Sequence, residues 1–254
     1  MTPHRLIGMV HLGPLPGAPD YRGDLRSVID AAAADAAILA DAGFDALLVE
    51  NLGDAPFIAD DVSKITVAAM TRAVEALVET GLPVGVNVLR NDALAALAIA
   101  SATGASFIRV NVLSGMMFTD QGPIVGKADE VARLRAEHCP DVAVMADVFV
   151  KHATPPGGLT LVEATHDLSE RSGADAVIVS GTATGAAADL DELAIVADNT
   201  HLPVYVGSGV TADSVAETLK IADGVIVGTA LKPDGRVGEP VDADLAGKLV
   251  AAAG

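Results

Sequence analysis

Residues 83–112, PVGVNVLRNDALAALAIASATGASFIRVNV, hold two apolar, β-branched runs on either side of an alanine-rich stretch. The runs at 83–89 and 106–112 are typical of buried strands, and the stretch at 91–103 is typical of a helix. Gly104 stands where a residue in the left-handed conformation would end that helix. A strand, a helix and a second strand of the same kind predict a βαβ unit with parallel strands.

The same unit recurs along the whole chain. We expect strands at 5–11, 45–51, 83–89, 106–112, 142–148, 175–181, 203–209 and 223–229. We expect helices at 24–42, 62–80, 91–103, 127–138, 160–172, 188–199, 211–221 and near 240–252. Eight strands that alternate with eight helices predict an α/β fold, a (β/α)8 TIM barrel formed by one domain over residues 1–254.

The charge balance is strongly acidic, with 34 Asp and Glu against 16 Lys and Arg and a formal net charge of −18. Such a surface repels the phosphates of nucleic acids and anionic lipids, so neither nucleic acid nor a membrane is an expected partner. A large acidic excess with few lysines is typical of adaptation to high salt. We therefore expect a halophilic source, with an ordinary acidic cytosolic protein as the alternative.

Targeting and cross-linking signals are absent from the sequence. The single cysteine, Cys139, excludes an intramolecular disulfide and a four-cysteine zinc site. The first residues lack the features of a signal peptide, and no apolar run reaches the roughly 18 residues that span a bilayer. We expect a cytoplasmic protein. Barrels of this size often pair through their helices, so a homo-oligomer and a monomer both stay open.

Polar residues gather where the predicted strands end, which is where the active site of a (β/α)8 barrel forms. They are His11, Glu50, Asn51, Asn87, Arg109, Asn111, Asp147, Ser180, Ser208 and Thr229. Because side chains alternate along a strand, Arg109 and Asn111 share a face and only one of Glu50 and Asn51 points inward. The expected substrate-binding residues are His11, Asn87, Arg109, Asn111 and Ser180. His11 either contacts the ligand or closes the barrel mouth through hydrogen bonds.

Glycines end three of the predicted strands, in VIVSG, VYVGSG and VIVGT. Glycine lets backbone N–H groups approach an anion, and the following helix adds the positive end of its dipole. A phosphate site after the seventh and eighth strands recurs in this fold. The expected phosphate-binding residues are Gly181, Gly207, Ser208, Gly209, Gly228 and Thr229. The alternative is that these glycines only permit tight turns.

The fifth strand and its loop, MADVFVKHATPP, hold the expected reactive groups. Asp147 is either an acid–base group, a metal ligand or a carboxylate that organises the loop. Lys151 either stabilises developing negative charge or is solvated, and a Schiff base on it is conceivable. His152 follows at a reach suited to proton transfer. Glu50 completes the set of expected catalytic residues.

Cofactor motifs give little support for a bound metal or nucleotide. Glu50 and Asp147 could jointly hold Mg²⁺, which prefers oxygen ligands, so Mg²⁺ is possible and the metal is unknown. No HxH, HExxH or CxxC spacing indicates zinc, no GxGxxG follows the first strand, and no GxxxxGK(S/T) occurs, which disfavours dinucleotide and P-loop chemistry. Residues 118–124, FTDQGPI, are expected to form a mobile covering loop in which Asp120 either reaches the site or only forms a turn.

Seven separated stretches resemble, in order, the BtpA family, which also includes the SgcQ-type proteins. They are IGMVHLGPLPGAP, DALLVENLGDAPF, VGVNVLRNDALAALAIA, FIRVNVLSG…TDQG, ADVFVKHA, PVYVGSGVT and ADGVIVGTALKPDG…PVD. The resemblance covers about residues 5–245 and implies a barrel related to the ribulose-phosphate-binding barrels. It implies no single reaction: cyanobacterial members are linked to photosystem I biogenesis, and SgcQ-type members to sugar metabolism and a nucleosidase label. The name phosphoribosylanthranilate isomerase, given to some members, is an analogy of fold.

Three functions follow from these observations. The first is an enzyme of the isomerase, lyase or nucleosidase type that acts on a small phosphorylated sugar or nucleoside-derived compound. The second is a non-catalytic assembly or stabilisation factor of the kind associated with photosystem I biogenesis. The third is a ligand-sensing barrel without turnover. Because polar residues end all eight predicted strands, the sequence favours the enzyme.

Overall fold

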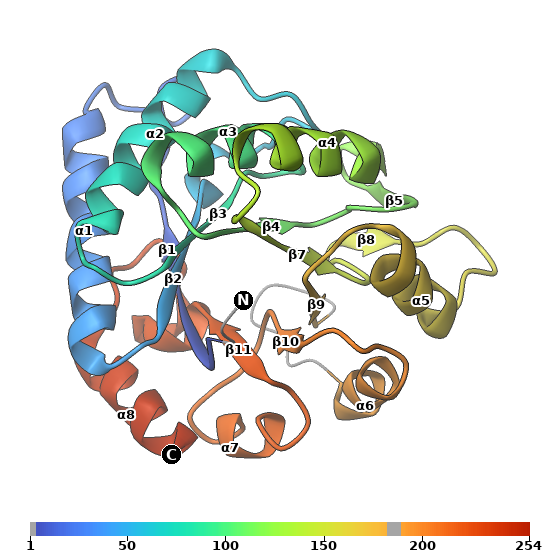
Figure 1. The fold of residues 1–254 in the computed structure, drawn as a ribbon. Coiled ribbons are helices and arrows are strands. Elements are labelled where there is room, and N and C mark those ends of the chain that lie inside the picture. Colours follow the sequence, from blue (N-terminus) through green and yellow to red (C-terminus); the bar gives the residue numbers. More distant parts are fainter. Residues whose placement is uncertain (1–3, 182–188) are drawn as a thin grey trace.

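Eight parallel strands form a closed barrel in the computed structural model, which describes residues 4–181 and 189–254 (Figure 1). The barrel strands are β1 (Leu6–His11), β2 (Ala46–Glu50), β3 (Val84–Asn87), β4 (Phe107–Val110), β7 (Ala143–Asp147), β9 (Ala176–Val179), β10 (Val204–Val206) and β11 (Gly224–Val227). Each strand pairs with the next in this order, and β1 pairs with β11 to close the ring. The predicted (β/α)8 barrel is confirmed.

Helices surround the ring of strands on the outside, as Figure 1 shows. Within the described residues they are α1 (Leu25–Ala42), α2 (Lys64–Val78), α3 (Ala93–Thr103), α4 (Ala128–His138), α5 (Leu161–Arg171), α6 (Leu190–Asp198), α7 (Val215–Thr218) and α8 (Ala243–Ala253). Short 3₁₀ turns follow β2 and β11: η1 (Leu52–Asp54), η2 (Thr229–Leu231) and η3 (Pro233–Gly235). The expected start of the sixth helix, at 188, lies outside the described residues. No described helix combines the length and apolar character needed to cross a membrane.

The helix in the opening stretch, α3, is fixed by its two ends. At its start the Asp92 carboxylate accepts a hydrogen bond from the Ala95 N–H at 2.8 Å. At its end Gly104 adopts the left-handed conformation, with φ of 77°, and its N–H donates to the Ala100 carbonyl. Only glycine adopts this conformation without steric cost, so the predicted end of the helix is confirmed.

Apolar side chains from alternate strand positions fill the amino-terminal part of the barrel. They are Ile7, Met9, Ala46, Leu48, Phe107, Ala143, Met145, Ala176, Ile178, Tyr205 and Ile226. The largest of them need glycine neighbours: a Cβ on Gly85 would lie 2.0 Å from the Phe107 ring, and one on Gly224 2.5 Å from the Tyr205 ring. Because this layer is tightly filled, the strand residues that follow it are held at the carboxyl end of the barrel.

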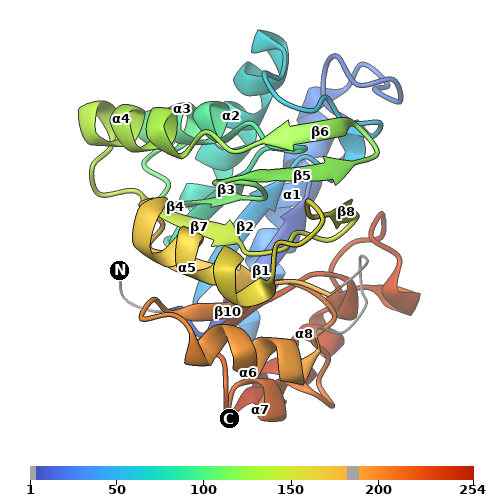
Figure 2. The same ribbon diagram turned by 90° about the vertical axis from the view of Figure 1, so that its right-hand side faces the viewer.

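The expected mobile loop at 118–124 is instead part of a small antiparallel sheet. Strands β5 (Met116–Thr119) and β6 (Gly122–Val125) form a hairpin, and β5 also pairs with β8 (Ala153–Thr154). Met117 and Ile124 are buried beneath it. In each arm a buried residue stands beside an exposed one, but the apolar residues are consecutive in the sequence, so no polar–apolar alternation distinguished the arms from a loop. Figure 2 shows this sheet at the end of the barrel toward which the arrowhead of β7 points.

The expected helix at 211–221 is shorter than predicted, because only Val215–Thr218 is regular helix. Before it, the Ser214 hydroxyl accepts from the Thr211 N–H at 3.0 Å. After it, the N–H groups of Lys220 and Ile221 donate to carbonyls three residues back rather than four. Hydroxyl side chains that compete for backbone groups and tight three-residue turns both limit a helix.

Candidate active site

Polar side chains continue the inward-facing rows of the barrel strands. Five of them lie two positions after an interior residue, as His11 follows Met9 and Glu50 follows Leu48: His11, Glu50, Arg109, Asp147 and Ser180. In the strand register His11 is paired with Glu50, and Glu50 with Asn87. Paired residues of parallel strands point the same way, so these side chains lie side by side at the carboxyl end. Glu50, and not Asn51, is therefore the inward residue of β2.

A buried cluster of Arg109, Asp147 and Ser180 forms the base of this end. Arg109 donates to both carboxylate oxygens of Asp147, each at 2.9 Å, and Ser180 Oγ donates to the same carboxylate at 2.6 Å. Burial alone would lower the pKa of Arg109, but the charge and hydrogen bonds of Asp147 raise it above its ordinary value. Both oxygens of Asp147 are thus engaged beneath the site.

The mouth pocket is a cavity of about 380 Å³ above this cluster. Its polar lining residues are His11, Glu50, Arg90, Asn111, Asp120, Lys151 and His152, and its apolar ones are Leu52, Phe57 and Leu89. Six of the residues singled out from the sequence are brought together here: His11, Glu50, Asn111, Asp120, Lys151 and His152. Arg109, Asp147 and Ser180 lie below, so the expected catalytic set does not share one cavity.

The glycine niche is a small cavity of about 20 Å³ beside the mouth pocket. Its lining includes five of the expected phosphate-binding residues: Gly207, Ser208, Gly209, Gly228 and Thr229. His11 and Lys151 line both the niche and the mouth pocket. A Cβ on Gly228 would lie 2.9 Å from His11 Cε1, so glycine is required for this close approach. The sixth expected residue, Gly181, ends the first described range and lines neither cavity.

Burial lowers the pKa of two residues that line both cavities, His11 and Lys151. Burial lowers the pKa of His11 to about 4, although Glu50 opposes the change, so His11 is neutral near pH 7. Its Nε2 lies 3.9 Å from Glu50 Oε1, and its buried Nδ1 has no hydrogen-bond partner in the described part of the chain. Burial also lowers the pKa of Lys151, and the charge of Glu50 again opposes the change. A buried lysine whose pKa is lowered in this way is typical of catalytic sites.

Arg90 is a lining residue that the sequence prediction did not assign to the site. Its guanidinium Nη2 donates to the Lys151 carbonyl at 2.7 Å, which joins the loops after β3 and β7. Burial lowers the pKa of Arg90, and the charges of Asp147 and Glu50 oppose the change. The crowding of polar residues directly after Asn87 was the signal that could have found it.

Other polar residues at the strand ends hold loops in place. Asn51 accepts a hydrogen bond from the Leu89 N–H at 2.7 Å and donates to Asp54 at 2.9 Å. The Asn87 side chain donates to the Asn111 side chain at 3.2 Å and so orients it toward the mouth pocket. Asn87 therefore supports the site from below rather than lining it.

The ligands for a shared Mg²⁺ ion are not assembled. Glu50 lines the mouth pocket, whereas both oxygens of Asp147 bind Arg109 below it. Among the residues that the structure describes, no group of three or more His, Cys, Asp or Glu residues is placed to hold a metal. Glu50 and Asp147 therefore do not form the expected pair of carboxylate ligands for Mg²⁺.

Sequence comparison identifies the family to which this chain belongs. Residues 2–254 match the sequence profile of the BtpA family. The chain belongs to the BtpA family. It is 52% identical to an uncharacterized protein of Thermococcus kodakarensis, over 96% of this chain and 93% of that protein. It is 47% identical to the photosystem I biogenesis protein BtpA of Synechocystis, over 95% of this chain and 85% of that protein.

A solved structure supports the fold of this BtpA-family protein. N-(5′-phosphoribosyl)anthranilate isomerase from Pyrococcus furiosus matches with a TM-score of 0.59, over 98% of each chain. The two sequences are 18% identical. Similarity at this level shows a shared barrel and leaves the reaction to be argued from the site itself.

Proposed function

We propose that this BtpA-family barrel is an enzyme that acts on a small phosphorylated sugar or nucleoside-derived compound. The observation that carries the proposal is that His11 and Lys151 line both the glycine niche and the mouth pocket. A phosphate group at the mouth of the niche would leave the rest of the molecule over Glu50. The isomerase in the structural comparison is named for a phosphoribosyl compound, which is consistent with such a ligand.

Phosphate binding is supported by the charges around the niche. Lys151 lines the niche itself, and Lys151 and Arg90 balance the charges of Glu50 and Asp120 in the mouth pocket, so the site is less acidic than a chain with a net charge of −18. The niche is too small for a whole phosphate, since about 20 Å³ holds roughly one water molecule. One phosphate oxygen would enter it toward the backbone of Gly207–Gly209, and the others would face Lys151.

Acid–base chemistry is best supported at Glu50. It is buried, lines the mouth pocket and lies beside His11, which is neutral near pH 7. A carboxylate there can take a proton from a bound sugar, and Lys151 can stabilise the negative charge that develops. Asp147 becomes a positioning residue in this proposal, because Arg109 and Ser180 occupy its oxygens. Isomerisation, glycosidic cleavage and carbon–carbon cleavage all fit these groups.

Turnover tests the proposal directly. Purified protein is incubated with ribose 5-phosphate, ribulose 5-phosphate and the nucleoside 5′-monophosphates, and products are followed by ¹H and ³¹P NMR. We expect turnover of at least one compound, and we expect Glu50→Gln to reduce its rate at least a hundredfold while binding persists. Equal turnover by Glu50→Gln would remove Glu50 from the mechanism. No turnover across the set would count against the enzyme.

An assembly factor is the second candidate, favoured by the 47% identity to the Synechocystis photosystem I biogenesis protein. Phe118 and Val125 of the β5–β6 hairpin are 49% and 59% exposed, which gives a partner protein an apolar contact. This function does not need Glu50. In a cyanobacterium that lacks its own family member, restored photosystem I content with Glu50→Gln as with the unchanged chain would support it; no restoration by either chain would count against it.

A further inference from the structure

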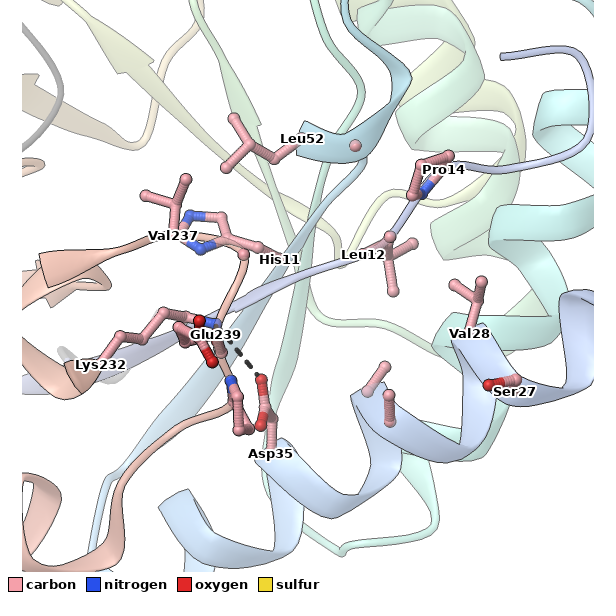
Figure 3. Close-up of a pocket in the computed structure, with 16 residues that line it drawn as sticks. His11, Leu12, Pro14, Ser27, Val28, Asp35, Leu52, Lys232, Val237 and Glu239 are labelled. Atoms are coloured by element: carbon pink, nitrogen blue, oxygen red, sulfur yellow. Dashed lines mark hydrogen bonds and ion pairs between the residues drawn. The ribbon is translucent and has the colours of Figure 1, made fainter. Parts of the chain in front are cut away.

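A second cavity lies outside the barrel mouth, between α1 and the segment 237–240 (Figure 3). This outer pocket has a volume of about 590 Å³, which makes it larger than the mouth pocket. Its walls are mostly apolar and include Leu12, Pro14, Val28, Ala32, Val237 and Pro240. A concave apolar cavity with a few polar groups is the usual form of a small-molecule site.

The charged groups at the base of the outer pocket are paired with each other. The Lys232 ammonium donates to the Glu239 carbonyl at 2.5 Å and lies 3.5 Å from Asp35 Oδ2. The other oxygen of Asp35 accepts from the Val241 N–H at 2.8 Å. Because Lys232 and Asp35 are both buried and their charges balance, the pocket offers no unpaired positive charge to an anion. Its chemistry suits a neutral group.

His11 connects the outer pocket to the candidate active site. It lines the outer pocket, the mouth pocket and the glycine niche, and Leu52 lines the first two of these. In Figure 3 its ring lies between Leu52 and Glu239. The buried Nδ1 has no hydrogen-bond partner within residues 4–181 and 189–254. A buried polar atom of this kind costs free energy unless a ligand or water completes it.

From these contacts we infer that the outer pocket binds a neutral aromatic or heteroaromatic ring joined to the phosphorylated part of the substrate. The substrate class is then a sugar phosphate that carries a ring, with phosphate at the glycine niche and the ring against Val28 and Val237. The connecting bond lies beside His11 and Glu50. The inference rests on the proposed function, because it places the phosphate of the same molecule at the niche.

Substitutions on α1 can test the outer pocket without touching the mouth pocket. Ala31 lines the outer pocket at an exposed helical position, so Ala31→Trp narrows the pocket and should not prevent folding. Ala34→Trp is a matched control, because Ala34 is also exposed on α1 and does not line the pocket. Binding is measured by calorimetry with ribose 5-phosphate and the four ribonucleoside 5′-monophosphates.

The unchanged protein should bind at least one nucleoside monophosphate tenfold or more tightly than ribose 5-phosphate. Ala31→Trp should remove that difference and leave the affinity for ribose 5-phosphate unchanged, while Ala34→Trp alters neither. In the unchanged protein the ¹⁵N shift of His11 Nδ1 should move further with the nucleotide than with ribose 5-phosphate, whose phosphate reaches only the niche side of His11.

Other outcomes would distinguish a failure of this inference from a failure of the proposed function. Binding of ribose 5-phosphate with no preference for any nucleotide would overturn the ring site and keep the phosphate site. An undiminished preference in Ala31→Trp would move the ring to another cavity and also overturn the inference. Absence of binding by every compound would overturn both.

Discussion

Arg109 and Asp147, from the neighbouring strands β4 and β7, form a doubly hydrogen-bonded ion pair beneath the mouth pocket. Both side chains are fully buried, and Ser180 completes the shell of the carboxylate. A side chain on Gly207 would meet this cluster, since its Cβ would lie 3.2 Å from Arg109 Nη2. The Arg109–Asp147 pair therefore fixes the base of the mouth pocket and supports the lining residues above this base.

Asp147→Asn should destabilise the fold, because it leaves the Arg109 charge buried without a counter-ion. Breaking one side of such a pair costs about 3–5 kcal/mol. Urea unfolding measures the loss, and Asp167→Asn, at an exposed position of α5, is the control that should change stability little. A variant of unchanged stability with lost activity would instead return Asp147 to the acid–base role that the sequence suggested.

Gly228→Val should weaken the binding of phosphorylated ligands at least tenfold while the barrel still folds. The added side chain would press on His11 and Met9 and distort the niche. Gly157→Val is the matched control, since nothing lies within 4 Å of a Cβ at that position. Calorimetry with ribose 5-phosphate measures the effect, and equal affinity in both variants would remove the niche from ligand binding.

Stability should fall as the pH drops from about 6.5 to about 4, in part because of His11. Its pKa is lowered to about 4 in the folded state. Between the two values the unfolded chain binds a proton that the folded chain does not, so the free energy of unfolding decreases with falling pH. Over the whole range His11 lowers the free energy of unfolding by about 3 kcal/mol. Urea unfolding at pH 7 and pH 4.5 should show a smaller drop for His11→Asn; an equal drop would contradict this assignment.

Salt should stabilise the protein, since a net charge of −18 repels itself in the compact state. At 2 M KCl this repulsion is screened over a few ångströms. We expect a higher melting temperature at 2 M than at 0.1 M KCl. A melting temperature that stays level or falls would remove the basis for predicting a halophilic source.

The sequence predicts the barrel well because local patterns determine it. Capping by Asp92 and Gly104 and the alternation along β2 and β4 each depend on a few neighbouring residues. The same alternation, extended from Leu48, selects Glu50 over Asn51. The sequence alone could therefore predict which single residues at the strand ends point into the barrel.

Contacts between residues far apart in the sequence could not be predicted. The pairing of Asp147 with Arg109 joins residues 38 apart, and it turned an expected catalytic carboxylate into a buried one. The bond from Arg90 to the Lys151 carbonyl spans 61 residues, and Lys232 meets Asp35 across 197. No local pattern encodes such pairs, so the mouth pocket was predicted in part and the outer pocket not at all.

The measurement that tests the account most directly is a calorimetric comparison of phosphorylated and unphosphorylated partners at high salt. Ribose 5-phosphate is set against ribose, and each nucleoside monophosphate against its nucleoside. The glycine niche and Lys151 predict that phosphorylation tightens binding at least tenfold for one or more pairs. Equal affinities within every pair, or no binding by any compound, would contradict a phosphate site at the barrel mouth.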